Sequence, residues 1–152
     1  MLLIKNFTKS KINEKFLRRV GKAALENIPA LKKIADLEID LAIVGEKKMK
    51  TLNRIWRGKD KATDVLSFES GQLAKKSKSF VFAPRDNFHL GEIIICYSVA
   101  ASQAREDGHS LDKEMAVLLI HGILHLAGYD HEKSEKEAKK MFVLQKKIIK
   151  KV

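Results

Sequence analysis

The sequence predicts a single domain, spanning 1–152, of the α/β or α+β class, and three observations support this prediction. Segments with the period of a strand alternate with segments with the period of a helix. No internal repeat and no Pro- or Gly-rich linker interrupts the 152 residues. One helical segment, from Met115 to Ala127, is apolar on nearly all sides, so we expect it to be the buried centre of the structure.

The first part of the chain predicts a strand, a helix and a second strand. Residues 2–7 predict a short strand, and Ser10 is the expected N-cap of the helix that follows. Apolar residues recur at helical spacing as far as Pro29, where we expect this helix to end. From Leu37 to Ile43 the apolar residues fall at every second position, which indicates a strand with one buried face.

The middle of the chain predicts a helix and two further strands. A short helix is expected from Met49 to Arg57, and residues 64–68 predict the third strand. Periodicity is lost between residues 71 and 89, whose basic tract at 75–78 we interpret as a solvated, mobile loop that could contact phosphates. Residues 90–97 contain three consecutive isoleucines and predict a strand buried on both faces.

The last part of the chain predicts three helices. Ser98 is the expected N-cap of the first, which ends at Gly108, and Ser110 is the expected N-cap of the apolar helix described above. The third runs from about Ser134 to Lys150, with apolar residues on one face and lysines on the other. Right-handed crossovers would place the helices on the faces of a small sheet.

Charge and apolar content narrow the class of protein. The 30 Lys and Arg against 19 Asp and Glu give a net charge of +11, which favours RNA, DNA or an anionic membrane as partner, although lysine-rich surfaces also serve solubility. No apolar run reaches the roughly 18 residues of a membrane span, and the N-terminal run stops at Lys5, too early for a signal peptide. The single cysteine, Cys96, excludes an internal disulfide and is expected to be buried. We therefore expect a cytoplasmic protein.

Three of the five histidines lie within eleven residues. His121 and His125 are four positions apart on the apolar helix, so their rings project from one face. Gly128 can end that helix in the left-handed conformation and return His131 to the same point. Unpartnered buried imidazoles would cost on the order of a few kcal/mol, and a shared metal removes this cost. Three imidazoles on one Zn²⁺ leave a fourth position open, as in catalytic sites, although they also suit Ni²⁺, Cu²⁺ or Fe²⁺.

The same spacing is shared by extended zinc-peptidase signatures, in which a glutamate follows the first histidine and acts as the general base. This chain has Gly122 at that position. A peptidase mechanism therefore lacks its base, while the metal site remains. The proton acceptor must lie elsewhere, or the substrate must carry its own nucleophile.

Four short segments together resemble one known family. They are Asn53-Arg-Ile-Trp-Arg57, Thr63-Asp-Val-Leu-Ser-Phe68, Leu90-Gly-Glu-Ile93 and His121-Gly-Ile-Leu-His-Leu-Ala-Gly-Tyr-Asp-His131. They resemble, in the same order, the N-x-x-[aromatic]-R, T-D-V-L-S-F, L-G-[DE]-I and H-G-x-L-H-L-x-G-Y-D-H segments of the YbeY family of bacterial rRNA maturation endoribonucleases. The match in length covers nearly the whole chain. One departure is visible, because Glu69 stands where family members often carry proline.

The resemblance implies a zinc-dependent endoribonuclease that cuts single-stranded RNA, takes part in 16S rRNA 3′-end maturation and works in ribosome quality control. It implies a mixed sheet of about four strands surrounded by helices, hence the α+β class. It also implies that His121, His125 and His131 hold one metal ion, with His121 and Arg57 needed for activity. The implied partners are ribosomal RNA, the small ribosomal subunit and its proteins, without a membrane.

Several functional interpretations have a simpler structural alternative. Arg57 could bind phosphate, but it is also a surface arginine at a helix end. Asp130 could orient a ligand histidine or accept a proton, or only cap the turn, and Trp56 could stack a base or belong to the core. His89 and His109 receive no role. For the whole chain, the alternatives to a nuclease are a ribosome-assembly or RNA-binding factor with a purely structural metal and, with less support, a zinc peptidase.

Overall fold

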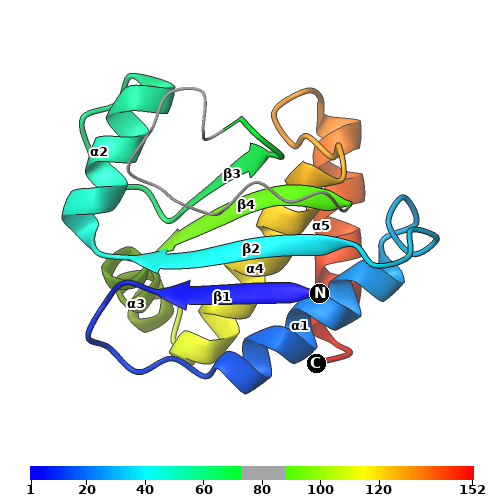
Figure 1. Cartoon of the computed structure of the whole chain (residues 1–152), viewed down its shortest axis with the longest axis horizontal. Helices are drawn as coiled ribbons and strands as arrows, with labels where there is room; N and C mark the ends of the chain where they lie inside the picture. Colours follow the sequence, from blue (N-terminus) through cyan, green and yellow to red (C-terminus); the bar gives the residue numbers. More distant parts are fainter. Residues whose placement is uncertain (73–87) are drawn as a thin grey trace.

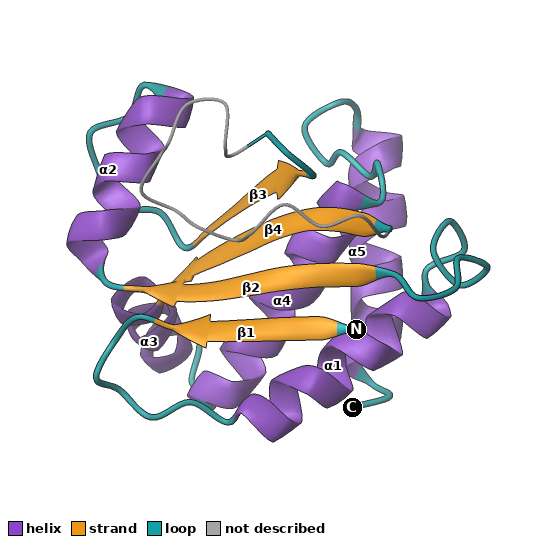
Figure 2. Ribbon diagram, in the orientation of Figure 1, coloured by secondary structure: helices purple, strands orange, loops and turns teal. Residues whose placement is uncertain are grey.

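The structure is a computed structural model that describes residues 1–72 and 88–152. Within these residues four strands form one sheet and five helices pack around it (Figures 1 and 2). The strands are β1 (Leu2–Asn6), β2 (Glu38–Val44), β3 (Val65–Glu69) and β4 (His89–Cys96). The helices are α1 (Glu14–Asn27), α2 (Glu46–Arg57), α3 (Tyr97–Glu106), α4 (Leu111–Leu126) and α5 (Glu135–Ile149). The α+β prediction is confirmed, whereas the basic tract at 75–78 lies outside the described residues.

The sheet is mixed, with strand order β1-β2-β4-β3. β1 pairs with β2 and β2 with β4 in parallel, and β3 pairs antiparallel with β4 at one edge. β2 and β4 are therefore the central strands, which explains their continuous apolar character. The edge strand β3 lies beside the groove described below.

The two faces of the sheet belong to two separate hydrophobic clusters. Leu41 and Ile93 face α1 and α4, while Ala42 and Ile94 face α2. Every residue of β2 after Glu38 is buried, so the prediction of a strand with one buried face is wrong. The reason is that β2 is a central strand of a sheet covered by helices on both sides.

α4 occupies the centre of the fold, as predicted. It packs against β3, β4, α1, α3 and α5, and Ser110 caps its N-terminus by accepting a hydrogen bond from the backbone N–H of Lys113. In Figure 2 α4 lies behind the sheet, with α3 on one side and α1 and α5 on the other. Among the described residues, no helix combines the length and the apolar character that a membrane span requires.

Two predicted helix caps are wrong. Asn13, not Ser10, caps α1, and its side chain accepts from the backbone N–H of Phe16. Ser10 belongs instead to the preceding turn, where its carbonyl accepts from the side chain of Asn6. α3 begins at Tyr97 with no side-chain cap, so Ser98 lies inside its first turn. Short polar residues satisfy local turns as readily as helix ends, which makes the choice between neighbouring candidates hard to predict.

Candidate metal centre

The C-terminal end of α4 and the turn that follows bring three histidines together. His121 and His125 lie one turn apart on α4, which ends at Leu126. Gly128 then takes a positive φ of 92°, a conformation that favours glycine, and the N–H of Tyr129 donates to the carbonyl of Leu124 at 3.0 Å. The chain therefore turns back, as the sequence predicted.

The rings of this histidine cluster (His121, His125, His131) surround one point. Their centroids are 4.7, 5.1 and 5.1 Å apart, and one nitrogen of each ring lies within 4.8 Å of the others. Nε2 of His121 and Nε2 of His125 are 3.1 Å apart. Nδ1 of His131 is buried with no hydrogen-bond partner in the described part of the chain. Such a set of converging nitrogens fits a metal ion with three imidazole ligands.

Burial favours the neutral form of two of the imidazoles, which is the form that binds a metal. It lowers the pKa of His121 and of His125 below their ordinary value, and for His125 the neighbouring rings lower the pKa further. Oε1 of Gln145 lies 3.2 Å from Nδ1 of His121. If Gln145 accepts the proton of Nδ1, Nε2 is left with a lone pair that faces His125.

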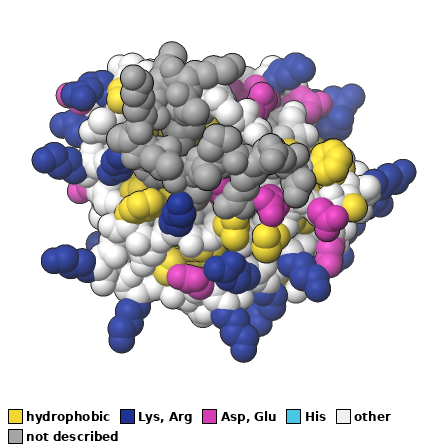
Figure 3. Space-filling view, in the orientation of Figure 1, with side chains coloured by type: hydrophobic (Ala, Val, Ile, Leu, Met, Phe, Trp, Pro, Cys, Tyr) yellow, Lys and Arg dark blue, Asp and Glu magenta, His cyan; other side chains and the backbone are white. Residues whose placement is uncertain are grey.

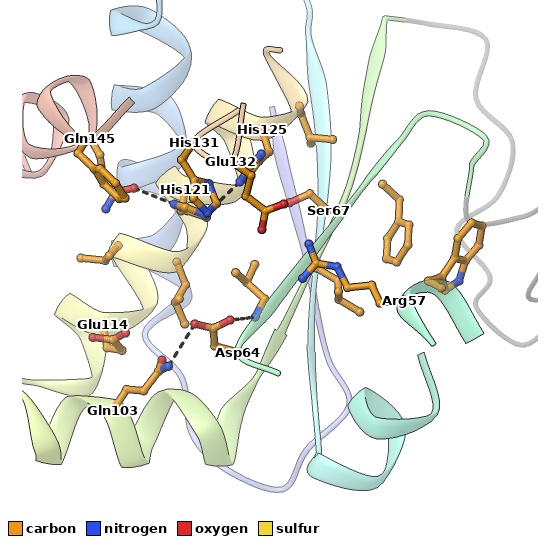
Figure 4. Close-up of a pocket in the computed structure, with 18 of the residues that line it drawn as sticks. Arg57, Asp64, Ser67, Gln103, Glu114, His121, His125, His131, Glu132 and Gln145 are labelled. Carbon is orange, nitrogen blue, oxygen red and sulfur yellow. Dashed lines mark hydrogen bonds between the residues drawn. The ribbon is translucent and has the colours of Figure 1, made fainter. Parts of the chain in front are cut away.

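The histidine cluster opens into a groove of about 820 Å³. Residues of α2, β3, α3, α4 and α5, and of the turn after α4, line this groove. Figure 4 shows the histidines on one wall and Arg57 on the opposite wall, with Ser67 and Glu132 between them and Asp64 lower, beside Gln103. The groove is thus assembled from segments far apart in the chain.

Arg57 is the last residue of α2 and is exposed. The helix ends there because Gly58 takes the left-handed conformation, with φ 67°. The charge of Arg57 contributes to lowering the pKa of His125, which places the guanidinium within electrostatic reach of the histidine cluster. The side chain can therefore contact a phosphate in the groove.

Three residues in the groove were not singled out from the sequence. Asp64 accepts from the backbone N–H of Val65 at 2.7 Å and from Nε2 of Gln103 at 3.2 Å. Glu132 follows His131 directly, and Gln145 contacts His121 from α5. A signal existed for Gln145, because it interrupts the apolar face of α5 with an amide. Asp64 could not be placed in the groove from the sequence, because this requires knowing that β3 packs beside α4.

Gly122 lies where α4 comes closest to the sheet. A Cβ at this position would lie 2.9 and 3.0 Å from methyl groups of Ile93 and 3.1 Å from Oγ of Ser67. The position therefore has no room for a side chain. A glutamate there would point into the interface between α4 and the sheet, so the geometry disfavours the peptidase mechanism as well as the sequence does.

The two ambiguous side chains of the sequence analysis have structural roles. Oδ1 of Asp130 accepts from the backbone N–H of Glu132 at 2.9 Å, so Asp130 caps the turn. Trp56 packs on Phe68 with ring centroids 5.0 Å apart, yet it is only partly buried and also lines the groove. Cys96 is buried at the end of β4, as predicted.

The described residues contain two further groups that combine histidine with carboxylates. One joins Asp40, His89 and Glu92, and the other joins Asp107, His109 and Glu114. In the second group Nε2 of His109 already pairs with Oε2 of Glu114 at 2.5 Å. The structure thus offers more than one arrangement that could hold a metal ion.

Comparisons with known proteins agree in one family. A family model described as Endoribonuclease YbeY matches residues 3–152. A protein of that name from Persephonella marina is 40% identical over 148 residues, which cover 97% of this chain and 89% of the relative. A further relative of the same name, from Thermotoga maritima, is 39% identical over 131 residues, 86% of this chain and 77% of its own.

One solved structure is similar to this chain over most of the length of both proteins. The solution structure of a protein from Thermotoga maritima matches with a TM-score of 0.60 and 37% sequence identity, covering 98% of this chain and 87% of that one. The similarity therefore extends over both the fold and the sequence.

Proposed function

This chain belongs to the endoribonuclease YbeY family, and from that premise we propose that it is a metal-dependent endoribonuclease that cleaves single-stranded RNA. One observation of the structure supports the proposal independently of the family name. The histidine cluster and Arg57 face each other across the same groove (Figure 4). This is the arrangement that phosphodiester cleavage needs, with a metal and a phosphate-binding cation on opposite sides of one phosphate.

His121, His125 and His131 would hold a Zn²⁺ ion, because three converging imidazoles suit zinc and leave one position open. A bound Zn²⁺ would polarise a phosphate oxygen or lower the pKa of a bound water. Gln145 would keep His121 in the tautomer that presents Nε2. Arg57 would donate two parallel hydrogen bonds to phosphate oxygens and stabilise the charge that develops on them.

The reaction also needs a proton acceptor, which the sequence analysis left open. RNA carries a 2′-hydroxyl beside each scissile phosphate, so its own oxygen can serve as nucleophile once deprotonated. Asp64 and Glu132 are carboxylates that line the groove, and Glu132 lies between Arg57 and the histidines (Figure 4). Asp64 is held by three hydrogen bonds, whereas Glu132 is exposed, and we propose Glu132 as the acceptor because it is free to move toward the substrate.

The surface charge supports a polyanionic substrate. The chain carries a net charge of +11, and Figure 3 shows Lys and Arg side chains spread around the margin of one face of the molecule. Trp56 offers a partly exposed ring at the edge of the groove on which a base could stack. Together these features favour an unpaired strand whose bases are accessible.

The cellular role rests on the family resemblance. We propose that the substrate is ribosomal RNA of the small subunit, that cleavage takes part in 16S rRNA 3′-end maturation and ribosome quality control, and that the protein acts in the cytoplasm on the small subunit and its proteins. The chain's basic surface is compatible with such an RNA-rich partner.

The test uses purified, zinc-loaded protein and an unstructured RNA oligonucleotide. We expect cleavage by the wild type and its loss in His121→Ala and Arg57→Ala. Arg54→Ala is the matched control, because Arg54 lies on the same helix but pairs with Asp60 outside the groove. Cleavage that persists in both variants would refute the proposed site. Association with ribosomes that survives Arg57→Ala, without cleavage of any RNA by the wild type, would instead support the non-catalytic assembly factor.

A further inference from the structure

An aromatic side chain of α5 lies exposed in the groove, beside the histidine cluster. Phe142 lines the groove and is 44% exposed. The helix is held against the core by other residues, because Met141 and Ile148 are its fully buried side chains. Phe142 therefore presents aromatic surface to whatever occupies the groove.

The ring of Phe142 packs on one of the proposed metal ligands. The ring centroids of Phe142 and His131 are 6.0 Å apart, and the ring planes are inclined by 50°, as in a tilted aromatic pair. Gln145, almost one turn further along α5, contacts His121. Two side chains of α5 thus belong to the wall that carries the histidine cluster. A base on the exposed part of the Phe142 ring can belong to the nucleotide whose phosphate lies at this cluster.

The groove also leads away from the histidine cluster toward the end of α3 and the start of α4, and this part is acidic. Its lining residues include three carboxylates, Glu106, Asp107 and Glu114. Figure 4 shows Glu114 and Gln103 away from the histidines, whereas Gln145 lies beside His121. A negatively charged strand is repelled by the carboxylates at this end.

The surface of α5 around Phe142 is basic instead. Lys139 lies three positions before Phe142 and Lys146 four positions after it, so both are its neighbours on the helix surface. Both lysines are exposed. An aromatic ring flanked by lysines is the combination that binds single strands, because the ring stacks on a base while the cations contact the backbone.

We propose that Phe142 forms a nucleobase-binding subsite, in which one base of the RNA stacks on the exposed ring and the adjoining phosphates contact Lys139 and Lys146. This inference rests on the proposed nuclease function and gives the bound strand its direction, from the histidine cluster across α5. Every base has a face that can stack, so the subsite accepts any base. A base inside a duplex has both faces covered, so the subsite favours unpaired strands.

The test measures binding of an unpaired 2′-O-methyl RNA oligonucleotide to the zinc-loaded protein by fluorescence anisotropy. The methyl group blocks the 2′-hydroxyl nucleophile, so binding is measured without cleavage. We expect Phe142→Ala and Phe142→Leu to bind on the order of tenfold more weakly than the wild type, and Phe142→Trp to retain the affinity. Val143→Ala is the matched control, because Val143 is also exposed but does not line the groove.

A strand of the same length without bases separates stacking from a structural effect. The wild type and Phe142→Ala should bind this abasic strand equally, because no base can stack on the ring. A merely structural role of Phe142 would weaken binding of both strands to the same extent, and this result would overturn the inference. Circular dichroism and the Tm of each variant verify that it is folded.

The salt dependence of binding tests the direction of the strand. Lys139→Gln and Lys146→Gln should each reduce the slope of log affinity against log salt concentration by about one. Lys140→Gln is the control, because Lys140 pairs with Glu137 at 3.4 Å. An unchanged slope in both Lys139→Gln and Lys146→Gln would overturn the proposed path across α5.

Failure of this inference differs from failure of the proposed function. RNA cleavage by the wild type, together with unchanged oligonucleotide binding in Phe142→Ala and Phe142→Leu, would overturn the subsite and leave the nuclease function in place. Binding that depends on Phe142, without cleavage of any RNA by the wild type, would support the subsite and refute the nuclease function. A wild type that binds no single-stranded RNA would overturn both.

Discussion

The histidine cluster and the group formed by Asp40, His89 and Glu92, called the sheet cluster, differ in how the chain assembles them. The first comes from one helix end and the turn after it, between His121 and His131, and opens into a groove. The second joins residues from two strands, Asp40 and Glu92, and is buried. An open site can admit a polymer, whereas a buried one can hold only a small ion. The comparison teaches that similar groups of polar side chains occur both in an open groove and inside the fold, and that only the first is accessible to a polymer.

The largest expected effect comes from Gly122, which fixes the distance between α4 and the sheet that separates the clusters. Gly122→Glu forces a charged side chain against Ile93 and Ser67, where no space exists. We expect a loss of roughly 3 kcal/mol or more in the free energy of unfolding, from overpacking and a buried charge together. Urea denaturation measures this. Gly45→Ala is the control, because a Cβ there meets nothing within 4 Å, and equal stability of the two variants would contradict the account.

The next prediction concerns only the groove into which the histidine cluster opens. Arg57→Lys keeps the positive charge but removes the planar pair of donors. We expect the rate of RNA cleavage to fall about 10²-fold, while RNA binding changes little, as for the loss of one transition-state donor. Single-turnover kinetics separates the rate from binding. Arg54→Lys on the same helix should behave as the wild type; a full rate in Arg57→Lys would mean that charge alone suffices.

A smaller effect concerns the support of the histidine cluster. Gln145→Leu removes the acceptor beside Nδ1 of His121 and leaves the ring less firmly oriented. We expect zinc affinity to fall 10–100-fold, with cleavage restored by added Zn²⁺. Competition with a chelator of known affinity measures this, and Lys146→Gln, at the next and exposed position, is the control. Unchanged affinity would show that Gln145 does not orient His121.

The smallest effect tests the sheet cluster through pH. The pKa of Glu92 is raised from 4.5 to about 7, first by burial and then by Asp40. Between these values the folded protein binds more protons than the unfolded chain, so the contribution of Glu92 to stability is complete below pH 4.5 and is lost as pH rises through 7. In chelator-treated protein this loss is on the order of 2 kcal/mol, and Glu92→Gln should remove it.

Urea denaturation of the wild type and Glu92→Gln at pH 5 and pH 8 checks this prediction. The difference between the two proteins isolates Glu92 from other titrating groups. The same pH dependence in both proteins would show that ionisation of Glu92 does not lower the free energy of unfolding.

The two clusters also show what could be predicted from the sequence. The alternation of strands and helices, the buried α4 and the meeting of the three histidines follow from local periodicity and spacing, and all are present in the structure. The sheet cluster could not be predicted, because it depends on the pairing of β2 with β4 and on the register shift that gives β4 one extra residue, Leu90. His89 received no role for this reason.

The same distinction explains the smaller errors. The burial of both faces of β2 depends on its central place in the sheet, which its own alternation does not reveal. The predicted caps at Ser10 and Ser98 are wrong because Asn13 caps α1 and α3 begins without any side-chain cap. Asp64 and Gln145 reach the groove only once β3 and α5 are packed beside α4.

The most direct test of the central claim is elemental analysis of the protein as isolated, combined with an RNA cleavage assay on the same sample. The wild type should contain zinc and cleave single-stranded RNA. His125→Ala should lose one equivalent of zinc and the cleavage activity together, whereas Glu92→Gln should keep both. Full zinc content and full cleavage in His125→Ala would contradict the assignment of the catalytic metal to the histidine cluster.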